Sequence, residues 1–188
     1  MGSSIISAWL VLLSATACIS QVRLFSDYSD YYLLEDAILK DNVNLLKQLL
    51  DNGTDAKAIS YDGETALYHA ARFGTQKIVE LLIPVSDVKA TYNNGDTALM
   101  RAAEHGTDKI VELLLPGSDA KAASKYGFTA LMLATRWGTD KMVELLIPVS
   151  DVKATNNDGQ TALDIAKSWG PRPRRERDRI VQLLSQAT

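Results

Sequence analysis

The sequence contains one cysteine and two histidines among its 188 residues. A structural zinc site normally needs four Cys or His ligands, and an intrachain disulfide needs two cysteines. Both features are therefore excluded, and we expect neither a metal nor a cofactor. With 11 glycines and 5 prolines, the chain is also not collagen-like or of low complexity.

The chain has no excess of basic residues. Its 20 Lys and Arg stand against 23 Asp and Glu, which gives a net charge of −3. This balance does not favour binding to nucleic acid or to anionic lipid. Because 46% of the residues are hydrophobic, the chain is not disordered, and its length indicates one domain or at most two.

The N-terminal segment has no charged side chain before Arg23 and contains a nine-residue apolar stretch at 5–13, followed by small residues. This layout predicts a signal peptide over 1–20, cleaved after Ala17 or Ser20, and a secreted or extracytoplasmic protein. Nine helical residues reach only about half of a ~30 Å bilayer core. An uncleaved membrane anchor and a cytoplasmic protein with a wrongly assigned start remain the alternatives. Residues 21–32 lack a helical period and are interpreted as a linker.

The rest of the chain is built on a 32-residue repeat. A glycine opens the pattern G-x-T-A-L at Gly63, Gly95, Gly127 and Gly159. A second glycine follows eleven residues later, at Gly74, Gly106, Gly138 and Gly170. Apolar residues at helical spacing lie between these landmarks and predict two short helices in each unit.

The ends of these helices also have sequence signals. We expect a threonine to cap the first helix at Thr65, Thr97, Thr129 and Thr161, and the second at Thr75, Thr107 and Thr139. The second glycine series should end the first helix in a left-handed conformation. Prolines end the second helix at Pro84, Pro116 and Pro148, and a turn-rich stretch suited to a β-hairpin follows.

This unit resembles the ankyrin repeat. The family opening T-P-L-H corresponds to Thr65-Ala66-Leu67-Tyr68, and the family closing pattern corresponds to residues 49–58. The family proline is alanine throughout, and the family histidine is replaced at Tyr68, Met100, Met132 and Asp164. The resemblance implies an all-α repeat solenoid of helix-turn-helix units joined by short β-hairpin loops.

We divide the repeat domain, 33–188, into an N-terminal cap unit (33–60), three interior units (61–92, 93–124 and 125–156) and a C-terminal cap unit (157–188). The last unit carries an insertion at 171–179 with five arginines against Glu176 and Asp178. Such a segment is typically a solvated, flexible connection, although contact with phosphate, nucleic acid or an acidic partner is the alternative.

The resemblance places binding in a concave groove formed by loop tips and first helices. The corresponding positions are Tyr61, Asp62, Glu64, Arg72 and Phe73; Asn93, Asn94, Asp96, Glu104 and His105; Lys125, Tyr126, Phe128, Arg136 and Trp137; and Asn157, Asp158, Gln160, Ser168 and Trp169. Residues 79–91 are identical to 143–155, whereas the groove positions differ between units. A variable groove on a constant framework favours a binding surface, although recent duplication also explains the identical blocks.

Aromatic residues and arginine, which dominate interface hot spots, are frequent in this set. Phe73, His105, Trp137 and Trp169 share one register 32 residues apart. They are either anchors for a partner or a stacked ladder that closes the groove wall, and the sequence does not distinguish the two.

A catalytic site is poorly supported. Glu104 and His105 are adjacent rather than facing, His69 lies one unit away, and we find no nucleophile or second carboxylate placed with either histidine. No phosphate-binding glycine loop occurs. The sequence therefore predicts a monomeric, non-enzymatic scaffold that binds a protein, with no nucleic-acid or small-molecule ligand and membrane contact only if the leader is retained. The rival interpretation is an enzyme that uses the groove.

Overall fold

The computed structural model describes residues 30–168 and 174–188. The leader predicted at 1–20, most of the linker, Gly170 and Trp169 lie outside these residues. Within the described ranges, no helix combines the length and the apolar character needed to cross a bilayer.

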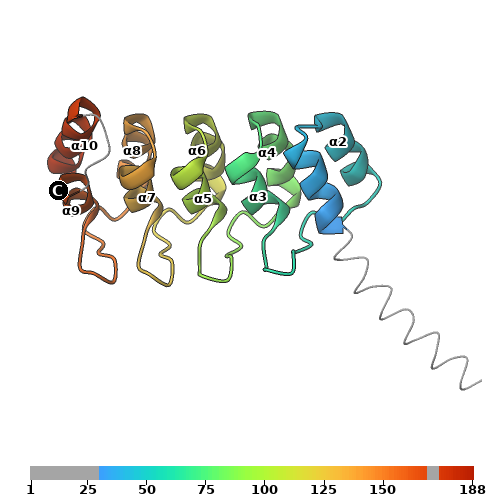
Figure 1. Cartoon of the computed structure of the whole chain (residues 1–188), viewed down its shortest axis with the longest axis horizontal. Coiled ribbons are helices and arrows are strands. Elements are labelled where there is room, and N and C mark those ends of the chain that lie inside the picture. The colour runs from blue at the N-terminus through green and yellow to red at the C-terminus, as the bar shows by residue number, and fades with distance from the viewer. Residues whose placement is uncertain (1–29, 169–173) are drawn as a thin grey trace, which may run out of the picture.

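The chain forms two layers of short helices arranged in a row (Figure 1). The inner helices are α3 (Ala66–Phe73), α5 (Ala98–His105), α7 (Ala130–Trp137) and α9 (Ala162–Ser168). The outer helices are α2 (Val43–Asp51), α4 (Gln76–Leu82), α6 (Asp108–Leu114), α8 (Asp140–Leu146) and α10 (Arg174–Ala187). Residues 30–39 are also helical and begin the first unit.

Each inner helix packs against the next inner helix, and each outer helix packs against the next outer helix. Leu67, Leu99 and Leu131 occupy the same position in successive units and are buried in one continuous core. Alanine occupies other buried positions of the inner helices, and its small side chain lets neighbouring inner helices approach closely. The predicted all-α repeat solenoid is confirmed.

The threonine caps largely follow the prediction. Thr65, Thr97 and Thr129 accept hydrogen bonds from the N–H groups of Tyr68, Met100 and Met132. Thr161 forms a reciprocal cap with Asp164, in which each side chain accepts the other residue's N–H at 3.0 to 3.2 Å. Thr107 and Thr139 cap the second helices.

Thr75 is the exception among the predicted caps. It lacks a side-chain capping bond, and its hydroxyl donates to Asp41 Oδ1 of the preceding unit at 2.7 Å. The cap predicted at Thr75 is therefore wrong.

The glycines that follow the inner helices are not left-handed, so this prediction is also wrong. Gly74, Gly106 and Gly138 have φ of −79°, −82° and −77°. Glycine is needed at Gly106 for a close approach instead, since a Cβ there would lie 2.9 Å from the carbonyl oxygen of Ala71. The positive-φ glycines lie elsewhere: Gly53 follows α2 with a φ of +88°, and Gly63, Gly95, Gly127 and Gly159 lie at the loop tips with φ between +76° and +84°.

The loops before the inner helices are reduced hairpins. Those before α3, α5 and α7 each have a single antiparallel bridge, at Ile59 and Thr65, Thr91 and Thr97, and Ala123 and Thr129. The outer helices end close to the predicted prolines, and the chain continues through the short 3₁₀ turns Ile83–Val85, Leu115–Gly117 and Ile147–Val149.

Both ends of the solenoid differ from expectation. Residues 30–32, assigned to the linker, are helical. Tyr31 is only 1% exposed, and its hydroxyl donates to Glu35 and Glu64. At the other end, residues 174–179 of the predicted flexible insertion form the start of α10.

Burial and ion pairs explain why the end of the insertion is helical. Ile180 and Leu184 of α10 are buried. Arg179 pairs with Asp140 at 2.9 Å and with Glu144 at 2.6 Å on α8.

Candidate functional site

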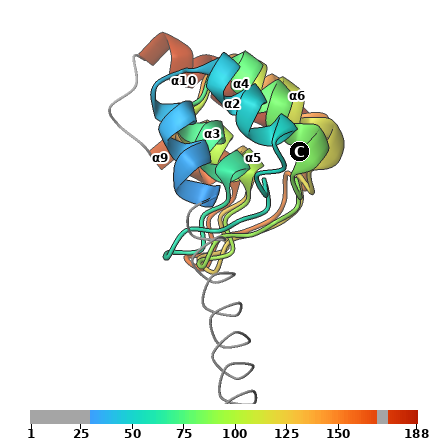
Figure 2. The same ribbon diagram turned by 90° about the vertical axis from the view of Figure 1, so that its right-hand side faces the viewer.

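The predicted groove residues lie at the two ends of the inner helices. One group sits on the loop tips just before each inner helix, and the other sits on the last residues of α3, α5 and α7. The loops project together beyond one side of the helical layers (Figure 2). We call the surface formed by these tips and the inner helices the inner face.

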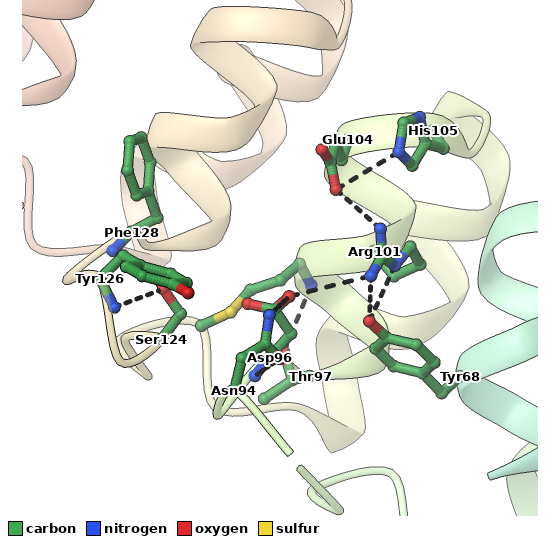
Figure 3. Close-up of polar contacts among 11 residues, drawn as sticks. Tyr68, Asn94, Asp96, Thr97, Arg101, Glu104, His105, Ser124, Tyr126 and Phe128 are labelled. Carbon is green, nitrogen blue, oxygen red and sulfur yellow. Dashed lines mark hydrogen bonds and ion pairs between the residues drawn. The ribbon is translucent and has the colours of Figure 1, made fainter. Parts of the chain in front are cut away.

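A polar network spans the middle of the inner face, between α3 and α5 (Figure 3). The guanidinium of Arg101 donates to the hydroxyl of Tyr68 from both Nε, at 3.0 Å, and Nη2. The central carbon of the guanidinium, Cζ, also lies 4.9 Å from the centroid of the Tyr68 ring. The network therefore joins two neighbouring units by a hydrogen bond and by a cation–π contact.

Four predicted site residues complete this network. Glu104 Oε2 lies 3.0 Å from Arg101 Nη1 and 3.4 Å from His105 Nε2. Asp96 accepts a 2.6 Å hydrogen bond from the side-chain amide of Asn94 and lies 3.9 Å from Arg101. Glu104 and His105 are therefore in contact, which corrects the expectation that they do not face each other.

Burial and charge shift the pKa values of this network in defined directions. Burial raises the pKa of Tyr68, and the hydrogen bond from Arg101 opposes that shift. Burial would lower the pKa of Arg101, but the contacts with Tyr68, Glu104 and Asp96 raise it overall. Burial also lowers the pKa of His105 against the opposing charge of Glu104, and Arg72 and Arg101 lower it further.

The loop of the second interior unit differs from the others around Tyr92. At the equivalent positions, side chains close the tips of their own loops: Ser60 accepts from Glu64 N, Ser124 from Phe128 N, and Asn156 from Gln160 N. Tyr92 instead stacks on Tyr68 with ring centroids 5.1 Å apart, and Asn94 accepts the N–H of Asp96. This unit has replaced a loop-closing side chain by an inter-unit aromatic contact.

Sequence reasoning missed Tyr68, Tyr92 and Arg101 as members of the site. The sequence signal was a break in the repeat, because each of these positions carries a residue type that the equivalent positions of the other units do not. The position of Arg101 carries His69, Leu133 and Ile165 in the other units. An arginine side chain that is only 16% exposed, at a position that is mostly apolar in the other units, requires a partner, and Tyr68 provides one.

Several predicted tip residues are used to join neighbouring loops. The Asn93 amide donates to the carbonyl of Asp62, and Lys125 N donates to the carbonyl of Asn94 at 2.7 Å. Asn157 donates to the carbonyls of Lys125 and Tyr126, at 2.9 and 3.1 Å. These bonds fix the loops as a row. Tyr61 and Tyr126 project from that row and are 80% and 64% exposed.

Aromatic residues at the ends of α3 and α7 are half exposed, each beside an arginine. Phe73 is 49% exposed with Arg72 over its ring at 4.5 Å, and Trp137 is 47% exposed with Arg136 over its ring at 5.0 Å. Phe73 also contacts His69 of its own helix. Neither ring is enclosed as a buried ladder would require. Trp169, the remaining aromatic in this register, lies outside the described residues.

A second polar cluster lies at the junction of the first two units. His69 Nδ1 is 3.5 Å from Glu64 and Nε2 is 3.8 Å from Glu35, while Tyr31 donates to both carboxylates at 3.4 Å. Sequence reasoning placed no carboxylate beside His69, so this is a correction. Glu64 is committed to this junction, and His69 itself is buried.

The remaining predicted positions are distributed around these clusters. Phe128 is partly buried against the core and receives Arg136 over its ring at 5.9 Å. Gln160 bonds to Asn156 of its own loop, and Asp158 and Ser168 are exposed on the last unit. Across the described part of the chain, no group of three His, Cys, Asp or Glu side chains is arranged to hold a metal ion.

The sequence also matches known proteins. The family model for ankyrin repeats, in three copies, matches residues 34–125 and 109–187. An ankyrin repeat protein of fowlpox virus (strain NVSL) is 36% identical over 50 residues, which is 27% of this chain and 36% of the viral protein. The match thus spans only about a third of that relative. With the family match covering most of the chain and the helical repeats that accompany it, the chain belongs to the ankyrin-repeat family.

Proposed function

We propose that this chain is an exported, monomeric scaffold that binds a partner protein through its inner face. Ankyrin repeats generally mediate protein–protein interaction and are typically non-enzymatic. The net charge of −3 favours a protein over nucleic acid.

The observation that carries the proposal is the exposure of aromatic side chains on this face. Four aromatic side chains have exposed fractions between 47% and 80%: Tyr61, Phe73, Tyr126 and Trp137. The core is filled mainly by aliphatic residues and does not contain these rings. Large aromatic residues are enriched in interface hot spots. The loop-to-loop hydrogen bonds hold the tips in place before binding, which reduces the ordering cost of association.

Affinity retention with matched variants tests the binding surface. The immobilised chain is exposed to extract and culture medium of its source cells, and retained proteins are quantified by mass spectrometry. One double variant, Tyr126→Ser with Trp137→Ser, removes two aromatics of the inner face. The control, Val85→Ser with Val149→Ser, removes two comparably exposed apolar residues from the turns after α4 and α8.

We expect proteins that are retained by the wild type and by the valine control but lost from the aromatic variant. Retention that is equal for both variants would contradict binding through the inner face.

Export is proposed from the uncharged segment before Arg23 and its nine-residue apolar stretch. Mass spectrometry of the native N-terminus tests it. We expect a mature chain that begins at Cys18 or Gln21, found outside the cytoplasm. An intact leader in the membrane fraction would instead identify an anchored protein.

A further inference from the structure

The turn after α2 departs from the repeat. The first unit carries Asn-Gly-Thr at 52–54, where the next unit carries Pro-Val-Ser at 84–86. Asparagine, any residue except proline, and then serine or threonine form the acceptor motif for N-linked glycosylation. No other asparagine of the sequence is followed two positions later by serine or threonine. The motif is therefore unique in this chain.

The fold uses the backbone of this turn but not the asparagine side chain. Gly53 N donates to the carbonyl of Leu50 at 3.0 Å, and Thr54 N donates to that of Leu49 at 3.1 Å. These two bonds end α2 and require the left-handed conformation of Gly53, whose φ is +88°. Asn52 has a φ of −84° and a ψ of 2°, which most residue types adopt. The helix end therefore needs glycine at 53 but does not need asparagine at 52.

The groups that a glycosyltransferase must reach are accessible. Asn52 and Gly53 are exposed, and a Cβ at Gly53 would meet no heavy atom within 4 Å. Within the described ranges, the side-chain amide of Asn52 makes no hydrogen bond. The serine hydroxyls at the position equivalent to Thr54 are buried, at Ser86, Ser118 and Ser150. Thr54 is partly exposed, and its hydroxyl is not enclosed in this way.

The motif lies apart from the surface that we propose for partner binding. Helix α2 belongs to the outer layer and to the unit at one end of the row (Figure 1). The inner face consists of the loop tips and the inner helices. A bulky, hydrophilic oligosaccharide on Asn52 would therefore project from the end of an outer helix rather than from a tip or an inner helix.

We propose that Asn52 carries an N-linked oligosaccharide that is added during export. The inference rests on the export proposed above, because this modification occurs in secreted proteins. It adds a modification site and the class of the second substrate, which is an oligosaccharide joined to a lipid pyrophosphate.

The reaction uses the free amide of Asn52. Its Nδ2 forms a bond to the anomeric carbon of the first sugar, and the bond between that carbon and the pyrophosphate oxygen breaks. The lipid pyrophosphate leaves, and an amide proton passes to a base of the transferase. No oxidation or reduction takes place.

Peptide mapping of the full chain from its source cells and their medium tests the modification. Peptide N-glycosidase in heavy-oxygen water converts a glycosylated asparagine to an aspartate that carries the heavy oxygen. The label is needed because Asn-Gly sequences also lose ammonia spontaneously, and a parallel incubation without the enzyme measures that background. Asn94 is the internal control, because it also precedes a glycine but has Asp96 at the third position.

We expect the heavy oxygen at position 52 and not at position 94. The intact protein should have a mass above that of the polypeptide, and the enzyme should remove the excess. Thr54→Ser keeps the acceptor motif and should keep the modification. Asn52→Gln and Thr54→Ala should each abolish it. Because Thr54→Ala retains the asparagine, its loss would show recognition of the motif rather than reaction of an exposed amide.

An unmodified Asn52 in chains whose leader has been cleaved would overturn the inference and leave export standing. Modification that persists in Thr54→Ala would also overturn it. Cytoplasmic chains that keep the whole leader and an unmodified Asn52 would overturn both the inference and export. The N-terminal peptide of the same digest separates these results. Binding through the inner face is tested independently by the Tyr126→Ser, Trp137→Ser variant.

Discussion

Arg101 donates to the hydroxyl of Tyr68, which lies 33 residues earlier in the chain and one unit away. The pair joins α3 to α5 on the inner face. The other units carry Met100, Met132 and Asp164 at the position of Tyr68, and His69, Leu133 and Ile165 at the position of Arg101. The side chain of Arg101 is only 16% exposed, and it reaches two carboxylates as well as the phenol. A substitution here therefore acts on the junction between units and on the shape of the inner face together.

The first prediction concerns this hydrogen bond. Tyr68→Phe keeps the buried ring and removes only the hydroxyl that accepts from Arg101. Because the donor is charged and largely buried, the free energy of unfolding should fall by about 1.5 to 3 kcal/mol. Urea denaturation measures the change. Tyr32→Phe, at a half-exposed ring of the first unit, is the control and should change stability by less than about 0.5 kcal/mol. Equal stability of Tyr68→Phe and wild type would refute the assigned role.

The second prediction distinguishes a close approach from a special backbone conformation. A methyl group at Gly106 would lie 2.8 to 2.9 Å from backbone atoms of Ala71 and Ala102. Gly106→Ala should therefore destabilise the protein by about 1 to 3 kcal/mol, even though its φ of −82° suits alanine.

Gly117→Ala is the matched control for this prediction. The three heavy atoms nearest to its methyl group would all belong to the side chain of Val88, at 3.3 to 3.4 Å. Thermal melting should show a much smaller effect at Gly117. A Gly106→Ala protein that melts like the wild type would contradict the tight packing of α3 against α5.

The third prediction is a pH dependence at His105. Burial lowers the pKa of this histidine in the folded state below its ordinary value of 6.5. As the pH falls through 6.5, the unfolded chain takes up a proton that the folded chain does not, so this group makes folding less favourable. The effect begins near pH 6.5 and extends down to the folded-state pKa.

Histidine NMR should show a titration midpoint for His105 below 6.5. His105→Asn should lose less stability than the wild type between pH 7 and pH 5. A His105 midpoint above that of a histidine in the unfolded chain would show that Glu104 dominates burial.

Much of the fold could be predicted because the repeat places the same chemistry at the same position in every unit. The G-x-T-A-L pattern located the loop tips and the starts of the inner helices, and Thr97 caps α5 as expected. Gly106 was assigned correctly to the end of a helix but with the wrong conformation. A glycine at the end of a helix is consistent either with a left-handed backbone conformation or with the close approach of another helix. Only the position of the neighbouring α3 decides between the two.

The candidate site was harder to predict for a related reason. Residues such as Asn93 and Asn157 lie at groove positions of the family, but they hydrogen bond to neighbouring loops. Tyr68 and Arg101 were outside the expected set because a contact between units depends on side-chain direction and reach. The local period of the sequence does not contain that information.

The central claim is that half-exposed aromatics of the inner face bind a protein, and Trp137 tests it most directly. The measurement is the affinity of Trp137→Ala for a partner that the wild type retains, by calorimetry on variant protein confirmed to be folded. We predict a loss of roughly 2 kcal/mol in binding free energy, about thirtyfold in Kd, with little loss of folding stability. An unchanged Kd, or a stability loss of about 3 to 5 kcal/mol as for a buried ring, would contradict it.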